Sequence, residues 1–225
     1  MRGFLFCLSL AATFSLTQTA TGTVVFETHS TATQTIASPL FGGAVVITGV
    51  GTQVFTIDPS SGFANVASDF KGSDLPNPLL PGGFLTYDLY NTATTGTVTI
   101  NGSGSYNIDF ELLFELRITN GPLSGLTFET MQLATFAASN IPTLPFPIGT
   151  AFSDPTPPDT LAISVKFDPT HTFSVGTVIG TSSNRVVTID GIIVPEPATW
   201  LMGAMGAGII ATLLRRKEKE VGSRS

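Results

Sequence analysis

A strict alternation of apolar and polar residues between Tyr106 and Ile118 constrains the fold of this 225-residue chain more than any other feature. Every second residue from Tyr106 onward is apolar, the residues between them are mostly charged, and only Leu113 breaks the pattern. Successive side chains of a strand point to opposite faces, whereas a helix would spread these apolar residues around its axis. The alternation therefore predicts a strand with one face against a core and the other in water.

The rest of residues 23–194 has the composition of strands and turns, because it is rich in Thr, Ser, Gly, Val, Ile and Phe. Further strands are predicted at Thr23–Thr28, Ala44–Val50, Gln53–Ile57, Phe84–Tyr90, Gly96–Ile100, Leu126–Met131, Leu161–Phe167, Thr172–Ile179 and Arg185–Val194. Turn signals such as Asn101-Gly102 and Asn120-Gly121-Pro122 separate several of these runs. Many short strands between turns predict an all-β domain at 23–194, an antiparallel β-sandwich or jelly roll.

Three segments of this domain are predicted to depart from the strand pattern. Gly62–Phe70 and Glu129–Ser139 are each candidates for a short helix. Ile141–Asp159 contains six prolines, and proline cannot serve in a central strand. This segment is therefore predicted to be a loop.

The first 22 residues have the pattern of a secretory signal peptide. Arg2 is followed by an apolar run from Gly3 to Leu16, which as a helix would measure about 21 Å and is too short to span a bilayer. Small residues follow, with Ala20 and Gly22 in a plausible cleavage context. We expect residues 1–22 to direct export and to be removed.

The C-terminal segment has the pattern of a single membrane-spanning helix. Residues 198–214 are uncharged and as a helix would measure about 25 Å, near the length needed for the hydrocarbon core. Trp200 lies near one border, and the basic residues Arg215, Arg216 and Lys217 follow the other. Clustered cations stay on the cytoplasmic side, so we expect the body outside and the tail inside.

The residues just before this span carry a recognisable motif. Val194-Pro195-Glu196-Pro197-Ala198-Thr199-Trp200, followed by the span and the basic cluster, resembles the PEP-CTERM sorting signal of Gram-negative bacteria. The two prolines also favour an extended backbone that a processing enzyme can grip. The resemblance covers about residues 194–219, so the sorting signal is placed at 195–219.

The resemblance implies recognition by an exosortase, cleavage near Pro195, Glu196 and Pro197, and delivery to the cell surface or an exopolysaccharide matrix. The chain would be anchored in the inner membrane only until it is processed. An ordinary single-span membrane protein is the alternative for this segment, although it needs no Pro-Glu-Pro motif.

Charge and cysteine content restrict the chemistry of the exported part. Residues 23–194 hold four Lys and Arg residues against thirteen Asp and Glu residues, a formal charge of −9. Such a surface argues against nucleic acid as a partner. The single cysteine, Cys7, lies in the predicted signal peptide, so disulfides and thiolate metal sites are excluded from the exported part.

Catalytic motifs are not found in the sequence. His29 and His171 are far apart and lie in no zinc or nucleophile motif, so each is interpreted as a surface or loop residue. Asp109 and Glu111 share one strand face, and paired carboxylates can hydrolyse glycosides, but a solvated face explains them better. Aromatic platforms for a sugar would have to come from Tyr87, Tyr90 or Tyr106. No catalytic residue is therefore predicted.

Calcium is the only metal for which candidate ligands are found. Several acidic residues lie in Gly-, Pro- and Ser-rich stretches, as calcium ligands often do. These candidates are Asp58, Asp69, Asp74, Asp154 and Asp159. No D-x-D-x-D-G spacing supports them, and no other cofactor is predicted.

Together these features predict an exported, non-enzymatic protein of the cell surface or extracellular matrix. Its expected role is structural or adhesive in an exopolysaccharide biofilm, with exopolysaccharide as a candidate partner. The alternative is a carbohydrate-binding module or a glycan-acting enzyme of the matrix.

Overall fold

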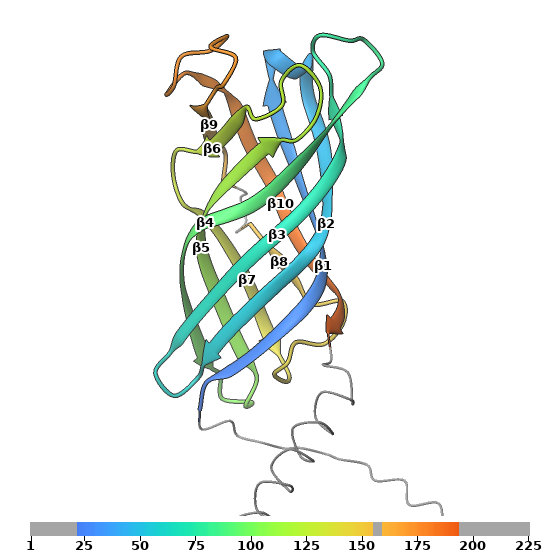
Figure 1. The fold of residues 1–225 in the computed structure, drawn as a ribbon. Coiled ribbons are helices and arrows are strands. Elements are labelled where there is room, and N and C mark those ends of the chain that lie inside the picture. The colour runs from blue at the N-terminus through green and yellow to red at the C-terminus, as the bar shows by residue number, and fades with distance from the viewer. Residues whose placement is uncertain (1–21, 155–158, 194–225) are drawn as a thin grey trace, which may run out of the picture.

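The computed structural model describes residues 22–154 and 159–193, and these form one antiparallel sheet with a single short helix. The elements in chain order are β1 (Val24–Ser38), the 3-10 helix η1 (Pro39–Phe41), β2 (Gly43–Asp58), β3 (Phe63–Pro76), β4 (Phe84–Ile100), β5 (Tyr106–Ile118), β6 (Thr127–Thr130), β7 (Ala134–Ile141), β8 (Ala151–Ser153), β9 (Leu161–Phe167) and β10 (Val178–Ile193). The long strands run obliquely around a common axis (Figure 1).

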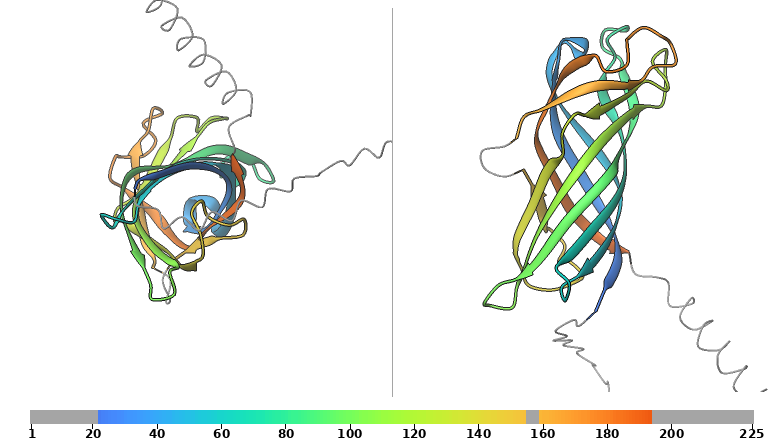
Figure 2. Two further views of the ribbon diagram at one scale, coloured as in Figure 1. Left: turned by 90° about the horizontal axis from the view of Figure 1, so that it is seen from below. Right: turned by 90° about the vertical axis from the view of Figure 1, so that its left-hand side faces the viewer.

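The sheet closes on itself into a barrel. Each of β1 to β4 pairs with the next strand, and β10 returns to pair with β1 from Glu27–Ile193 to Ala37–Thr181. Between β5 and β10 the wall is built from two short stretches, β6 with β9 and β7 with β8. Figure 2 shows the closed ring along its axis. Within the described residues, closure leaves no long strand edge open for pairing with another chain.

The all-β, antiparallel character predicted from the sequence is confirmed, but the two-layer sandwich or jelly roll is wrong. The physical reason is strand length and pairing. Ala44–Val50 and Gln53–Ile57 are parts of one strand, β2, and Phe84–Tyr90 and Gly96–Ile100 are both parts of β4. Strands this long twist strongly, and a sheet whose last strand meets its first closes instead of stacking on a second sheet.

Four local predictions are also corrected. Gly62–Phe70 lies almost entirely in β3, and Glu129–Ser139 contains the end of β6 and most of β7, so neither is a helix. The proline-rich loop contains the three-residue strand β8. In the predicted strand Thr172–Ile179, residues 172–177 form turns, and only the last two residues belong to β10. For the two predicted helices and for β8, pairing with neighbouring strands decides the conformation, and the local sequence does not contain that information.

The apolar face of β5 points into the barrel, as its alternation predicts. Phe110 and Ile108 are almost fully buried, and the Phe cluster around Phe110 extends to Phe55, Phe146 and Phe152, with ring centroids 4.8 to 5.9 Å apart. Each such ring contributes roughly 1.5–3 kcal/mol by leaving water. The core therefore fills this part of the barrel interior.

Two aromatic rings close the barrel at its ends. Phe146 belongs to the loop between β7 and β8 and packs edge-on against Phe26 near the start of β1. At the opposite end Phe41 of η1 packs edge-on against Phe128 of β6. Ser38 caps η1 by accepting a hydrogen bond from the Leu40 backbone N–H. The cap and the helix hold Phe41 over the interior.

The start of the first strand lies beside the end of the last strand. Glu27 of β1 is the pairing partner of Ile193, the last residue of β10. Both strand ends lie at the lower end of the barrel in Figure 1. The chain therefore enters and leaves the fold at the same end. The predicted signal peptide (except Gly22), the Pro-Glu-Pro motif, the span at 198–214 and the basic cluster lie outside the described residues.

Candidate functional site

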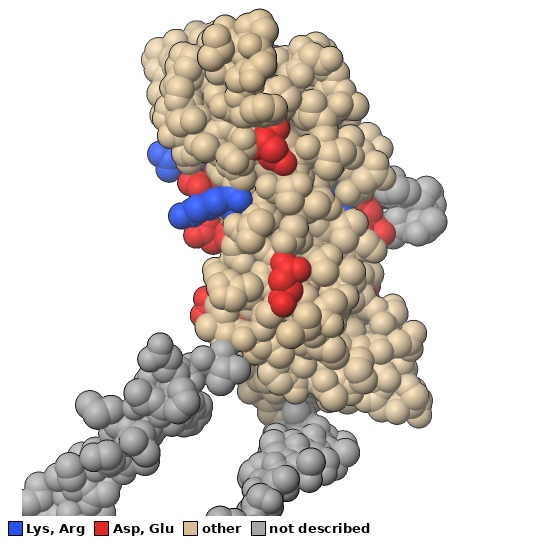
Figure 3. Space-filling model, turned by 90° about the vertical axis from the view of Figure 1, so that its right-hand side faces the viewer, with Lys and Arg blue, Asp and Glu red and all other residues tan. Residues whose placement is uncertain are grey.

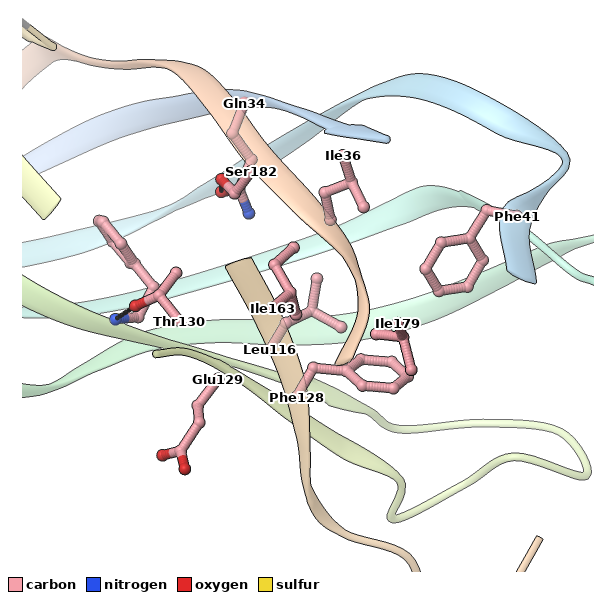
Figure 4. A pocket seen from close by; sticks show the side chains of 11 residues that line it. Gln34, Ile36, Phe41, Leu116, Phe128, Glu129, Thr130, Ile163, Ile179 and Ser182 are labelled. Atoms are coloured by element: carbon pink, nitrogen blue, oxygen red, sulfur yellow. Dashed lines mark hydrogen bonds between the residues drawn. The ribbon is translucent and has the colours of Figure 1, made fainter. Parts of the chain in front are cut away.

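The barrel interior leaves little room for a ligand. A cavity of about 20 Å³ lies beneath Phe41, lined mainly by Ile36, Leu116, Ile163 and Ile179. Figure 4 shows these apolar side chains converging, while the carboxylate of Glu129 points away from them. Such a volume holds about one water molecule, whereas ligand pockets usually measure about 300–1,000 Å³. This cavity is therefore a packing defect of the core.

One ion pair is buried in the wall, where β10 changes partners from β9 to β8. Arg185 is 1 % exposed, and its Nε lies 3.0 Å from Oδ1 of Asp154. Its guanidinium also donates to the backbone oxygens of Ser182, at 2.9 Å, and Asp159, at 3.1 Å. Burial lowers the pKa of Arg185 and raises the pKa of Asp154. Arg185 thus links Asp154, which follows β8, to Asp159, which precedes β9, and this indicates a structural role.

A concave site lies on the outer face of the barrel, over β4, β5, β6 and β9. We call it the outer groove, and it has a volume of about 490 Å³. Its lining consists of three charged residues, two aromatic residues, one threonine and one glycine. These are Tyr90, Glu115, Arg117, Gly125, Thr127, Lys166 and Phe167.

Strand register explains how these side chains meet. Tyr90 of β4 is paired with Glu115 of β5, and Glu115 is paired in turn with Glu129 of β6. Residues directly opposite on neighbouring strands have side chains on the same face, about 4.5–5.5 Å apart. Three residues from three separate segments of the sequence therefore form one row across the outside of the barrel.

Glu115 is the central group of the outer groove. It is 7 % exposed although it lies on the outer face, because its neighbours cover it. One carboxylate oxygen accepts a hydrogen bond from the Tyr90 hydroxyl, and the other is paired with the Lys166 ammonium. Lys166 also lies 3.2 Å from Glu129. The network satisfies the buried charge of Glu115.

The network changes the acidity of its members. The pKa of Tyr90 is raised to about 12. Burial is the larger cause, and the hydrogen bond to the Glu115 carboxylate is the second. The hydrogen bond to Glu115 raises the pKa of Lys166 as well. At neutral pH the phenol therefore stays protonated and the lysine stays charged.

A β-bulge places two successive side chains of β9 in the groove. The pairing of β6 with β9 shifts between Thr127 and Phe128, so Lys166 and Phe167 are both exposed instead of alternating. Bulges often redirect side chains in this way beside functional sites. Phe167 is 56 % exposed, so one aromatic ring is available to a ligand beside the charged row.

The calcium candidates do not come together. Asp58 binds the hydroxyl of Ser60, Asp74 accepts from the Tyr87 hydroxyl at 2.7 Å, and Asp154 is paired with Arg185. In the described ranges no three His, Cys, Asp or Glu residues form a group that could hold a metal. Asp69 lies exposed on β3, and Asp159 contributes its backbone oxygen to Arg185. Calcium binding remains a prediction.

The other candidates from the sequence are dispersed as well. His29 and His171 are both exposed, as interpreted from the sequence, and so are Asp109 and Glu111. Tyr87 and Tyr106 are buried, at 1 % and 7 % exposed, so they cannot serve as sugar platforms, whereas Tyr90 lines the outer groove. Arg117, Lys166 and Phe167 were not recognised, because only the barrel brings β9 beside β5 and β6.

The sorting residues Pro195, Glu196 and Pro197 and the membrane stop Arg215, Arg216 and Lys217 fall outside the described residues. In the part of the chain that the structure covers, no helix is long and apolar enough to cross a membrane.

Comparison with known proteins identifies the C-terminal segment and one similar fold. Residues 194–217 match the model of the PEP-CTERM protein-sorting motif, which confirms the resemblance seen in the sequence. No curated protein matches the chain. A solved structure of DynF from the dynemicin biosynthesis pathway of Micromonospora chersina is similar in fold, with 11 % sequence identity and a TM-score of 0.54. The match covers 77 % of this chain and 83 % of DynF.

Proposed function

From the PEP-CTERM motif at residues 194–217, we propose that this chain is an exported protein with a structural or adhesive role in an exopolysaccharide matrix. The motif implies processing by an exosortase. In this proposal residues 198–214 hold the chain in the inner membrane until cleavage near Pro195, with the basic cluster in the cytoplasm. The barrel then reaches the cell surface without its anchor.

The position of the chain ends in the barrel supports this sequence of events. β10 ends at Ile193, two residues before Pro195, and its end pairs with β1 close to where the export signal is attached. The barrel would therefore lie directly above the bilayer, held by one end. Removing the tail takes away no residue of a described strand.

The architecture is also consistent with a protein that must be stable outside the cell. The exported part contains no cysteine, so disulfides cannot stabilise it. A sheet that closes on itself, with aromatic rings packed at both ends, stabilises the fold in their place. Closure also protects the protein from edge-to-edge aggregation in a crowded matrix.

A carbohydrate-binding or glycan-acting role is the second candidate. It is favoured by the outer groove, which combines an exposed ring with a row of hydrogen-bonding groups. The non-enzymatic version is preferred, because both histidines and the pair Asp109 and Glu111 lie apart from the residues that line the groove.

The decisive measurement is the C-terminal mass of the native protein recovered from cells with an active exosortase. We expect a chain that ends near Pro195–Pro197 and is found in the surface fraction. A variant with Glu196→Ala and Pro197→Ala should accumulate uncleaved in the inner membrane, while Glu218→Ala, beyond the basic cluster, should be processed normally. Native protein that retains Ser225 and stays in the inner membrane would contradict the proposal.

A further inference from the structure

We infer that the outer groove binds a segment of a neutral polysaccharide. The inference rests on the proposed exposure of the barrel to a polysaccharide matrix, and it adds the site and the class of glycan. The groove measures about 490 Å³, which is within the range of small-ligand sites and larger than the interior cavity of about 20 Å³.

The charge balance of the groove selects a neutral ligand. Lys166 is already paired with both Glu115 and Glu129, and Glu115 also accepts from Tyr90. Arg117 in turn lies opposite Asp88 of β4 in the strand register, so each cation of the groove has a carboxylate as its neighbour. An ionic ligand would have to break existing pairs and desolvate charges, which is costly.

Sugar hydroxyls match the hydrogen-bonding capacity that remains. A hydroxyl both donates and accepts, so it can bind a free carboxylate lone pair or an N–H of the guanidinium without displacing a partner. Arg117 is exposed and offers a planar fork of donors, whereas Thr127 is buried and its hydroxyl already donates to the backbone oxygen of Gly125. Hydrogen bonds to charged groups are the stronger kind, which compensates for the open shape of the groove.

Phe167 provides the apolar surface that a sugar ring needs. The ring is 56 % exposed beside the polar row, and the bulge in β9 holds it next to Lys166. The C–H face of a pyranose can cover such a ring while its hydroxyls reach the polar row. Exposed aromatic rings elsewhere, such as Phe84 at 61 %, do not line this groove.

The opposite side of the barrel offers no such combination. On the side that carries β1 and β2, charged side chains gather at mid-height and the surface above and below them is uncharged (Figure 3). Its outward residues include exposed valines such as Val46 and Val50. The exposed large apolar residues of β1 and β2 are all valines, so these two strands present no exposed aromatic ring.

The test uses the full-length protein with defined oligosaccharides. Cellohexaose, laminarihexaose and mannohexaose are the neutral probes, and an oligogalacturonate is the anionic comparator, all measured by titration calorimetry. We expect at least one neutral probe to bind, with an affinity that changes little with salt, because the charges of the groove compensate each other. Phe167→Ala and Arg117→Ala should each weaken binding about tenfold or more.

Matched variants separate binding from folding. Phe84→Ala removes a similarly exposed ring outside the groove and should leave the affinity unchanged. Trp200 is the only tryptophan of the chain, so Phe167→Trp in a Trp200→Phe background gives an indole signal that reports the groove alone. That signal should change on titration with the neutral probe that binds.

Three results would overturn the inference: no neutral probe binds, a neutral probe binds equally well to Phe167→Ala, or only oligogalacturonate binds and its affinity falls steeply with salt. A protein that is cleaved near Pro195 and exported but binds no neutral glycan contradicts this inference alone. A protein that binds the glycan but keeps Ser225 in the inner membrane contradicts the proposed function alone.

Discussion

At the scale of single residues, two polar networks are built into opposite environments. Arg185 and Asp154 form an ion pair inside the wall, whereas Glu115 and Lys166 form theirs on the outer face. A buried pair becomes costly when one partner is removed, because the other charge is then left without compensation. In the outer pair Glu115 is covered but the side chain of Lys166 is 40 % exposed, so water screens that pair and weakens its contribution to stability. The two networks should therefore respond differently to substitution.

Arg185→Met should lower the free energy of unfolding by about 3–5 kcal/mol, because it leaves the carboxylate of Asp154 buried without a counterion. Urea unfolding followed by circular dichroism measures the loss. Arg117→Met, at an exposed arginine, should change stability by less than about 0.5 kcal/mol. The double variant Arg185→Met with Asp154→Asn should recover part of the loss. Equal stability of Arg185→Met and the natural chain would refute a stabilising pair.

Tyr90 should titrate at about pH 12 instead of near its ordinary value of 10.0. Because the folded-state pKa is raised, the contribution of the Tyr90–Glu115 contact to stability is complete below pH 10 and is lost as the pH rises through 12. NMR of the tyrosine ring carbons measures this titration and distinguishes the Tyr90 signal from those of Tyr87 and Tyr106.

Glu115→Gln should move the pKa of Tyr90 back toward 10.0 only in part, because burial, the larger cause, remains. Glu111→Gln is the control and should leave that pKa unchanged, because Glu111 lies on the same outer face but its carboxylate accepts a hydrogen bond from Thr95. A Tyr90 that ionises near pH 10 in the natural chain would show that the contact with Glu115 is absent in solution.

At the scale of elements, close approach between strands depends on glycines that the alternation pattern does not explain. Gly51 lies inside β2 opposite Phe70 of β3. A Cβ atom there would lie 1.9 Å from the backbone oxygen of Asp69 and 2.7 Å from Cα of Phe70. Neither backbone atom can move without breaking the ladder between β2 and β3. Glycine is thus required by the curvature of the sheet.

Gly51→Ala should cost about 3 kcal/mol of unfolding free energy, at the upper end of the range for overpacking. Gly102→Ala is the matched control, because a Cβ atom at Gly102 would meet nothing within 4 Å. The midpoints of urea unfolding of the two variants give the comparison. If both variants unfold at the same urea concentration, β2 and β3 do not approach as closely as described.

At the scale of the whole molecule, the closing contact between β1 and β10 holds the barrel together. The C-terminal half of β10 pairs with β1 from Thr33–Val186 to Glu27–Ile193, and it also pairs with β8. No other strand among the described residues can cover that edge of β1, because its other edge already pairs with β2. The fold therefore depends on the last residues before the sorting motif.

A chain of residues 22–193 should fold, whereas a chain of residues 22–185 should lose the cooperative fold and aggregate through the exposed edge of β1. Circular dichroism and size-exclusion chromatography distinguish the two outcomes. The longer chain also mimics the product of cleavage near Pro195. A monomeric, cooperatively unfolding 22–185 fragment would mean that closure by β10 is dispensable.

Features that depend on local pattern could be predicted from the amino-acid sequence. The alternation of apolar and polar residues correctly predicted the inward and outward faces of β5, although not that neighbouring side chains cover Glu115. The Pro-Glu-Pro motif, the apolar span and the basic cluster identified the sorting signal. Both are readable because their physical cause lies within a few residues of chain: the pleat of a strand, and the order of a motif, an apolar run and a cationic border.

The choice between stacked sheets and a closed barrel, and the assembly of the outer groove, follow from long-range strand pairing. Whether β10 returns to β1 depends on pairings more than 140 residues apart, which no local propensity encodes. Lys166 and Phe167 likewise reach Glu115 only because β6 lies between β5 and β9 and a bulge turns both side chains outward. Strand register, which is a property of partners and not of single segments, sets both outcomes.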